Sequence, residues 1–145
     1  MQNATANASP SAQSAMWRIR LFGDMRRNLT NAQHLSALLL AVLGGGEDDE
    51  PLDIKTDRFN CFGIVADLVE SSYDAAEQLE GDNRSFSLYT LKMQYVEQYL
   101  RLLATKAGCS DFDRAAAAGL AEQLVSELYD EMENYSNQYP GDQLQ

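Results

Sequence analysis

Acidic side chains recur at helical spacing in the segment from Gly63 to Gly81, GIVADLVESSYDAAEQLEG. Gaps of three, four and three residues separate four carboxylates, which on a helix form one stripe: Asp67, Glu70, Asp74 and Glu77. Carboxylates one turn apart can share a hard cation such as Mg²⁺, which then polarises a phosphate group. The stripe therefore either binds a metal ion or forms the wet side of a packed helix.

The helical phase of the four carboxylates favours a solvent-exposed face over a metal site. The apolar side chains of this segment, from Phe62 to Leu79, cluster around one direction of the helix. The four carboxylates occupy an arc of about 80° that is centred well away from that direction. We therefore expect the stripe to face solvent.

A catalytic alternative rests on two further acidic pairs. All-helical nucleotide pyrophosphohydrolases hold magnesium with ExxE and ExxD pairs on neighbouring helices, and this sequence offers Glu77 with Glu80 and Glu127 with Asp130. The first pair lacks a doubled glutamate, and both pairs point away from the predicted core. A magnesium-dependent enzyme of this kind stays an alternative, whereas we expect no metal site and no catalysis.

Other signatures of catalysis or cofactor binding are missing from the sequence. It contains no GxxxxGK[ST], GxGxxG or HExxH motif. Cys61 and Cys109 lack the CxxC spacing of a zinc or redox site, and His34 is the only histidine. We expect no cofactor, and two reduced thiols are typical of a cytoplasmic protein.

The charge is unevenly divided along the chain. The 145 residues suit one domain, and the formal net charge is −11. Residues 1–46 hold four arginines and one aspartate, a net charge of +3, whereas residues 47–145 hold 7 basic and 21 acidic residues, a net charge of −14. An acidic body repels phosphate backbones, so we expect no direct nucleic-acid binding. A nucleic-acid-mimicking inhibitor of a basic protein groove is a second alternative function.

Periodicity and capping residues predict four helices. They cover about residues 30–43 with Thr30 or Asn31 as the N-cap, 58–80, 85 or 87 to 107, and Ser110 or Asp111 to beyond 135. Short connections between the last three helices imply antiparallel neighbours. The expected fold is therefore an all-α up-and-down bundle of four main helices.

The third of these helices has an unusually wide apolar arc. Its apolar residues, among them Tyr95 and Leu102, span more than half of the circumference. We therefore expect this helix to be the most enclosed, and truncation of Tyr95 or Leu102 to destabilise the core.

The ends of the chain differ from the bundle in composition. Residues 1–15 contain no charge and predict a disordered tail, residues 16–140 form the single domain, and residues 141–145 form a C-terminal tail. The longest apolar run, Leu35 to Leu43, is far shorter than the roughly 20 residues of a membrane span. We expect no membrane contact and a cytoplasmic location.

A basic-aromatic segment, MWRIRLFGDMRR (16–27), precedes the first predicted helix. Its pattern fits either a short helix docked on the bundle or an extended strand or arm. Because aromatic and arginine side chains are enriched at protein interfaces, the candidate partner-binding residues are Trp17, Arg18, Arg20, Tyr135 and Tyr139.

Together these features favour a small acidic helical protein that acts by protein–protein interaction. Its role would be regulatory or accessory, without catalysis. The sequence does not identify the partner, and it leaves a homo-oligomer open.

Overall fold

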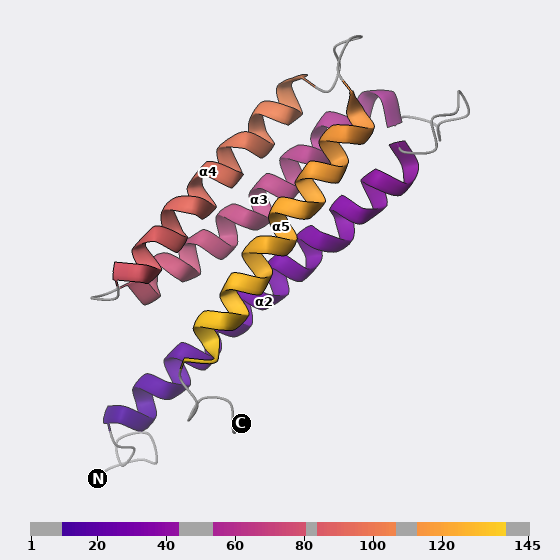
Figure 1. Ribbon diagram of the computed structural model, residues 1–145. Coiled ribbons are helices and arrows are strands. Elements are labelled where there is room, and N and C mark those ends of the chain that lie inside the picture. Colours follow the sequence, from indigo (N-terminus) through magenta and orange to yellow (C-terminus); the bar gives the residue numbers. More distant parts are fainter. Residues whose placement is uncertain (1–9, 44–53, 81–83, 107–112, 139–145) are drawn as a thin grey trace.

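The computed structural model describes residues 10–43, 54–80, 84–106 and 113–138, which form an up-and-down bundle of four helices (Figure 1). The helices are α2 (Pro10–Leu43), α3 (Ile54–Glu80), α4 (Arg84–Lys106) and α5 (Arg114–Ser136). No strand occurs in those ranges. The predicted all-α four-helix bundle is confirmed.

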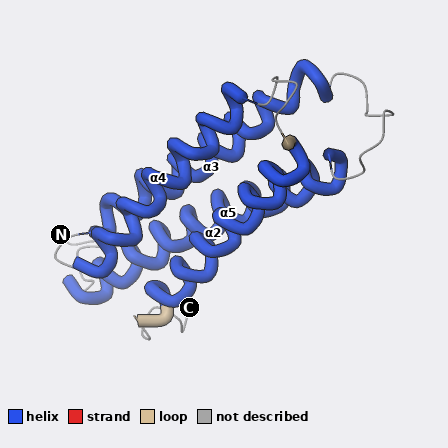
Figure 2. Tube along the Cα trace, turned by 45° about the horizontal axis from the view of Figure 1, so that its top comes forward, coloured by secondary structure: helices blue, strands red, loops and turns tan. Residues whose placement is uncertain are grey.

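The four helices do not pack equally on one another. α2 packs extensively on both α3 and α5, and α3 packs extensively on α4, whereas α4 contacts α5 much less. Figure 2 shows α3 beside α4 and α2 beside α5. As a result α3 and α5 occupy opposite corners of the bundle, and so do α2 and α4.

The first helix is longer than the sequence predicted. α2 is one helix of 34 residues, so 16–27 is neither a strand nor a separate short helix, and no N-cap interrupts the chain at Thr30 or Asn31. Buried apolar side chains follow one another at helical spacing through the expected break: Leu21, Met25, Leu29 and Ala32. This continuous buried face outweighs the weak capping preference of a single threonine or asparagine.

The helix ends are also partly corrected. α2 begins at Pro10, a residue type suited to the first helical position, so residues 10–15 belong to the helix and not to the expected tail. Residues 1–9 lie outside the described residues. α5 begins at Arg114, later than predicted, because Asp113 is its N-cap and accepts a hydrogen bond from the Ala116 amide at 3.0 Å.

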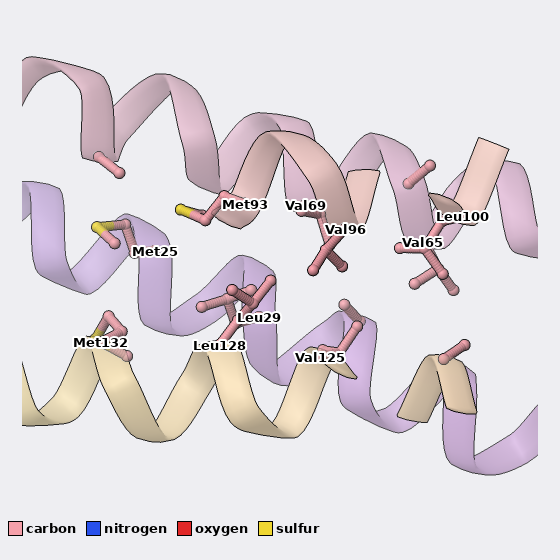
Figure 3. Close-up of a cluster of buried hydrophobic side chains, with 14 of the residues drawn as sticks. Met25, Leu29, Val65, Val69, Met93, Val96, Leu100, Val125, Leu128 and Met132 are labelled. Atoms are coloured by element: carbon pink, nitrogen blue, oxygen red, sulfur yellow. The ribbon is translucent and has the colours of Figure 1, made fainter. Parts of the chain in front are cut away.

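All four helices contribute to one hydrophobic core (Figure 3). Its middle holds Met25, Leu29, Val69, Met93 and Leu128, each of them fully buried. At the end where α4 begins, aromatic rings replace the aliphatic side chains. Phe86 packs edge-on against both Phe22 and Tyr135, with ring centroids 6.3 and 4.9 Å apart.

The prediction that α4 is the most enclosed helix is wrong. Tyr95 is 62% exposed and Leu102 is 52% exposed. α4 buries a single face, including Met93 and Leu100, and packs mainly on α3. A wide apolar arc thus reflects one buried face together with a second apolar surface.

Candidate interaction surface

The carboxylate stripe on α3 faces solvent, as its phase predicted. Asp67, Glu70, Asp74 and Glu77 are all exposed. Arg101 of α4 donates hydrogen bonds to Asp67 Oδ1 at 3.0 Å and to Glu70 Oε1 at 2.9 Å, and it also pairs with Glu97. Exposed ion pairs of this kind stabilise a fold by about 1 kcal/mol or less. Asp67 and Glu70 of the stripe therefore connect α3 with α4, and Glu77 accepts a hydrogen bond from the Tyr73 hydroxyl of its own helix at 3.3 Å.

The residues of the magnesium alternative are not brought together. Glu77 lies on α3, whereas Glu127 and Asp130 lie on α5 at the opposite corner of the bundle. Glu127 Oε1 lies 3.6 Å from Lys92 Nζ, and Glu80 is the last residue of α3. Within the described ranges, no three histidine, cysteine or acidic side chains group closely enough to hold a metal ion. The acidic residues of α3 and α5 therefore do not share one metal-binding position in this fold.

Polar contacts join α2 and α5 along their length. Arg26 donates to both carboxylate oxygens of Glu133 at 3.0 and 2.9 Å, and the Tyr129 hydroxyl donates to the same carboxylate at 2.9 Å. The hydrogen bond from Arg26 is the main reason why the pKa of Glu133 lies below its ordinary value. Two turns further on, Gln33 Nε2 donates to Ser126 Oγ at 3.2 Å. These pairs fix the antiparallel register of the two helices.

Two side chains from the first half of α4, Tyr89 and Lys92, make polar contacts with α5. The Tyr89 hydroxyl donates to the Leu128 carbonyl at 2.7 Å, and burial is the main reason why the pKa of Tyr89 is raised. Lys92 Nζ donates to Glu131 Oε2 at 2.6 Å, a bond that raises the pKa of the lysine. As a whole, α4 is less closely associated with α5 than with α3.

Charge alternates around the bundle. The sequence of α2 and that of α4 each carry a net charge of +3, whereas α3 and α5 each carry −4. Every pair of neighbouring helices is therefore of opposite charge, and each diagonal pair is of like charge. The four helices together carry only −2, so the other −9 of the net −11 lies in the connections and terminal segments. This alternation favours the observed neighbours over a bundle in which like helices are adjacent.

Apolar side chains form a second stripe on the outer face of α4. Leu88 is 66% exposed, Leu91 42%, Tyr95 62% and Leu102 52%, and the half-buried Tyr99 lies beside them. We call these five residues the α4 stripe. Their gaps of three and four residues place them along one side of the helix, opposite the buried face. None of them is charged, and clustered exposed apolar surface of this kind marks sites of protein contact.

The N-terminal candidates occupy a separate surface. Trp17 is 38% exposed, Arg20 is exposed and Arg18 is half-buried. Because the Arg26–Glu133 pair sets Ser136 level with Gly23, the first turns of α2 extend beyond the end of α5 (Figure 1). Within the described ranges, no residue of α5 therefore lies beside this end of α2.

Of the two C-terminal candidates, the structure describes Tyr135. Tyr135 is half-buried and packs its ring against Phe86 and Tyr89. Tyr139 lies outside the described residues. The aromatic ring of Tyr135 thus belongs to the packing at the end of the core.

Sequence reasoning missed the α4 stripe as a surface, although the sequence contains a signal for it. A helix in a four-helix bundle needs an apolar arc only wide enough to cover its core face. The apolar arc of residues 84–106 is wider than the core face requires. This extra width indicated a second apolar surface instead of deeper burial.

No helix in the described parts of the chain has the length and apolar character needed to cross a membrane. No protein-family model matches the chain, and neither a curated protein nor a solved structure matches it.

Proposed function

We propose that this protein has a regulatory or accessory role without catalysis, and that it acts by binding protein through the α4 stripe. The observation that supports the proposal is the concentration of exposed large apolar side chains on one helix: Leu88, Leu91, Tyr95 and Leu102. Exposing these side chains to water is unfavourable, and their burial by a protein chain recovers that free energy. A cytoplasmic location remains part of the proposal.

The stripe also has the chemical character of a protein-binding helix face. Leucine and tyrosine at gaps of three and four residues match the anchors by which one helix packs against another. The polar neighbours of the stripe, such as Gln98 and Thr105, provide an uncharged rim on one side. Tyr95 lies at the middle of the stripe, where a tyrosine contributes most to binding.

Capture from an extract of the source cells, with the purified protein as bait, tests the proposal. We expect Tyr95→Glu and Leu102→Glu to lose the captured protein. Leu38→Glu is the matched control, because Leu38 is 60% exposed on α2 and does not belong to the stripe. All three variants should melt like the wild type, since they replace exposed side chains. Equal capture by the stripe variants and the wild type contradicts the proposal.

A smaller contact is proposed at the N-terminal end of α2, with Trp17 as its anchor and Arg18 and Arg20 beside it. Tryptophan and arginine are enriched among residues that dominate interface energy. Trp17→Ala is expected to weaken capture while leaving the melting temperature nearly unchanged. A lower melting temperature without loss of capture would instead assign Trp17 to the packing of α2 against its own bundle.

A further inference from the structure

We infer that the partner of the α4 stripe is an amphipathic helix of another protein, in which a row of apolar side chains is flanked by lysine and arginine. This inference rests on the proposed function and names the chemistry of the partner. It is carried by the carboxylates that border the stripe on both sides and by the uncharged, helix-spaced stripe between them.

Carboxylates of α3 border the stripe along one side. Arg101 of α4 donates hydrogen bonds to Asp67 and Glu70, at 3.0 and 2.9 Å, so this part of α3 lies level with the second half of the stripe. Because α3 and α4 run antiparallel, the other two exposed carboxylates of α3 lie level with its first half: Asp74 and Glu77. Among the described residues, no cation pairs with these two.

Two carboxylates of α5 border the stripe on its other side. Lys92 lies beside the stripe, four residues after Leu88, and its Nζ is 2.6 Å from Glu131 Oε2 and 3.6 Å from Glu127 Oε1. One lysine between two carboxylates leaves a net charge of −1 on this side. The side chains of all three are partly exposed, so this charge acts at the surface.

The surroundings of the stripe are therefore acidic. Seven carboxylates and two basic side chains lie along its two sides, a net charge of −5: Asp67, Glu70, Asp74, Glu77, Glu97, Glu127 and Glu131, with Lys92 and Arg101. Counting Arg84 and Lys106, the residues at the two ends of α4, the net charge is still −3. The acidic charge thus lies along the sides of the stripe and not at its ends.

This distribution of charge selects among partners. A helix with basic flanks is attracted on both sides of the stripe. Nucleic acid, an anionic membrane surface and a second copy of this chain, whose net charge is −11, are all repelled. Burial of the apolar stripe supplies the binding free energy, and the carboxylates determine which apolar helices can approach.

A helix also fits the stripe in length and in reach. From Leu88 to Leu102 the stripe is about 21 Å long, which is four turns of a helix. A helix packed on α4 lies with its axis about 8–10 Å away. Lysine and arginine side chains on its flanks are long enough to extend sideways over α3 and α5, while their apolar stems stay on the contact. Because a single helix pair falls short of the ~800 Å² per partner of a standard interface, we expect dissociation in the micromolar range.

Fluorescence anisotropy with three labelled helical peptides and the full chain tests the charge of the partner. Each peptide has about 18 residues and the same row of leucines at gaps of three and four, which covers the stripe. The three differ only in their flanking residues, which are lysine, glutamine or glutamate. We expect the lysine peptide to bind in the micromolar range and the glutamate peptide to bind about tenfold or more weakly. Equal affinity of the three peptides, or no binding of the lysine peptide, overturns the inference.

Variants of the full chain test whether the lysine peptide binds at the stripe. Tyr95→Glu adds a negative charge, so attraction by charge alone would strengthen binding, whereas docking on the stripe predicts a loss of about tenfold or more. Tighter binding by this variant overturns the inference. Circular dichroism of each variant establishes that it is folded.

A second pair of variants tests the carboxylate border. Asp74→Asn combined with Glu77→Gln is expected to weaken binding of the lysine peptide at low salt, and to have little effect in 1 M salt, where charges are screened beyond about 3 Å. The matched control is Asp24→Asn combined with Glu122→Gln, which changes the net charge equally. Asp24 lies on α2, and Glu122 lies on the side of α5 that faces α2, so this control should bind like the wild type. Equal losses in both double variants would assign the effect to net charge and overturn the inference.

The outcomes separate this inference from the proposed function. If the lysine peptide does not bind, but Tyr95→Glu abolishes capture of a cellular protein, the proposed function stands and the inference is wrong. If sedimentation finds a wild-type dimer that Tyr95→Glu reduces to 16.1 kDa, the partner is a second copy and the inference is again wrong. If Tyr95→Glu changes neither capture nor peptide binding, both are wrong.

Discussion

The outer faces of α3 and α4 differ although the two helices are neighbours of similar length. On α3 the exposed side chains from Asp67 to Glu77 include four carboxylates, which water solvates well and two of which also pair with Arg101. On α4 the exposed positions include Leu88, Tyr95 and Leu102, which water solvates poorly. The most charged face of this bundle is therefore its least promising binding site, and the face without charge is the most promising one.

The largest expected effect comes from truncating the buried face of α4. Met93→Ala and Leu100→Ala remove fully buried side chains and should each lower the free energy of unfolding by ~2–5 kcal/mol. Tyr95→Ala and Leu102→Ala on the outer face should cost about 1 kcal/mol or less in the monomer. Urea denaturation of dilute protein measures all four. Similar losses on both faces would contradict the division of α4 into a core face and a binding face.

A smaller effect separates two tyrosines of the same helix. Tyr89→Phe removes the hydrogen bond to the Leu128 carbonyl and is expected to cost about 1 kcal/mol. Tyr95→Phe is the matched control, because the Tyr95 hydroxyl lies on the exposed face, and its stability should equal that of the wild type. Thermal melting of the pair provides the measurement. A loss confined to Tyr95→Phe would reverse the assignment of the two faces.

Unlike the exposed carboxylates of α3, Glu133 lies between two helices, α2 and α5. The pKa of Glu133 is lowered from 4.5, chiefly by the hydrogen bond from Arg26. Its stabilising contribution is therefore complete above pH 4.5 and is lost as the pH falls through the lower folded-state pKa. Because both side chains are about one-third exposed, we expect Glu133→Gln to cost about 1 kcal/mol or less at neutral pH.

The measurement for Glu133 is the free energy of unfolding of wild type and Glu133→Gln as a function of pH. The difference between the two proteins should shrink as the solution is acidified below pH 4.5. A difference that stays constant with pH would show that Glu133 acts through packing and not through its charge.

The smallest effect is expected on the outer face of α3. Each change of Asp67, Glu70, Asp74 or Glu77 to the corresponding amide should alter the free energy of unfolding by no more than about 0.5 kcal/mol. Loss of the Arg101 pairs is offset by relief of repulsion between carboxylates one turn apart. A fall in melting temperature of about 10 °C for the quadruple variant would show that these carboxylates have a structural or ligand-binding role. Adding Mg²⁺ to the wild type should likewise leave its melting temperature unchanged.

Much of the fold could be predicted from periodicity, and the exceptions have physical causes. The apolar arc of α3 is narrow, so its phase located both the buried side and the solvated carboxylates. The arc of α4 is too wide for phase to separate a core face from a binding face, so Tyr95 and Leu102 were misplaced. The continuity of α2 depends on contacts of Met25 and Leu29 with distant helices, which no local capping preference reveals.

The binding surface was less predictable than the fold. Trp17 and Arg20 stood out by residue type, and the structure leaves both exposed. Tyr135 has the same chemical character but packs against Phe86, because its place on α5 turns it towards the start of α4. Residue type alone does not distinguish an aromatic anchor for a partner from an aromatic ring at the end of a core.

The pairing of α5 with α2 also sets an order of folding. α3 forms beside α2 and α4 forms beside α3 from consecutive stretches of chain, whereas Arg26 and Glu133 lie 107 residues apart. Closing so long a loop costs more conformational entropy than forming the two local hairpins. We therefore expect α5 to be the last of these four helices to dock and the first to detach. Its backbone amides should exchange with solvent through an opening that leaves α2, α3 and α4 together.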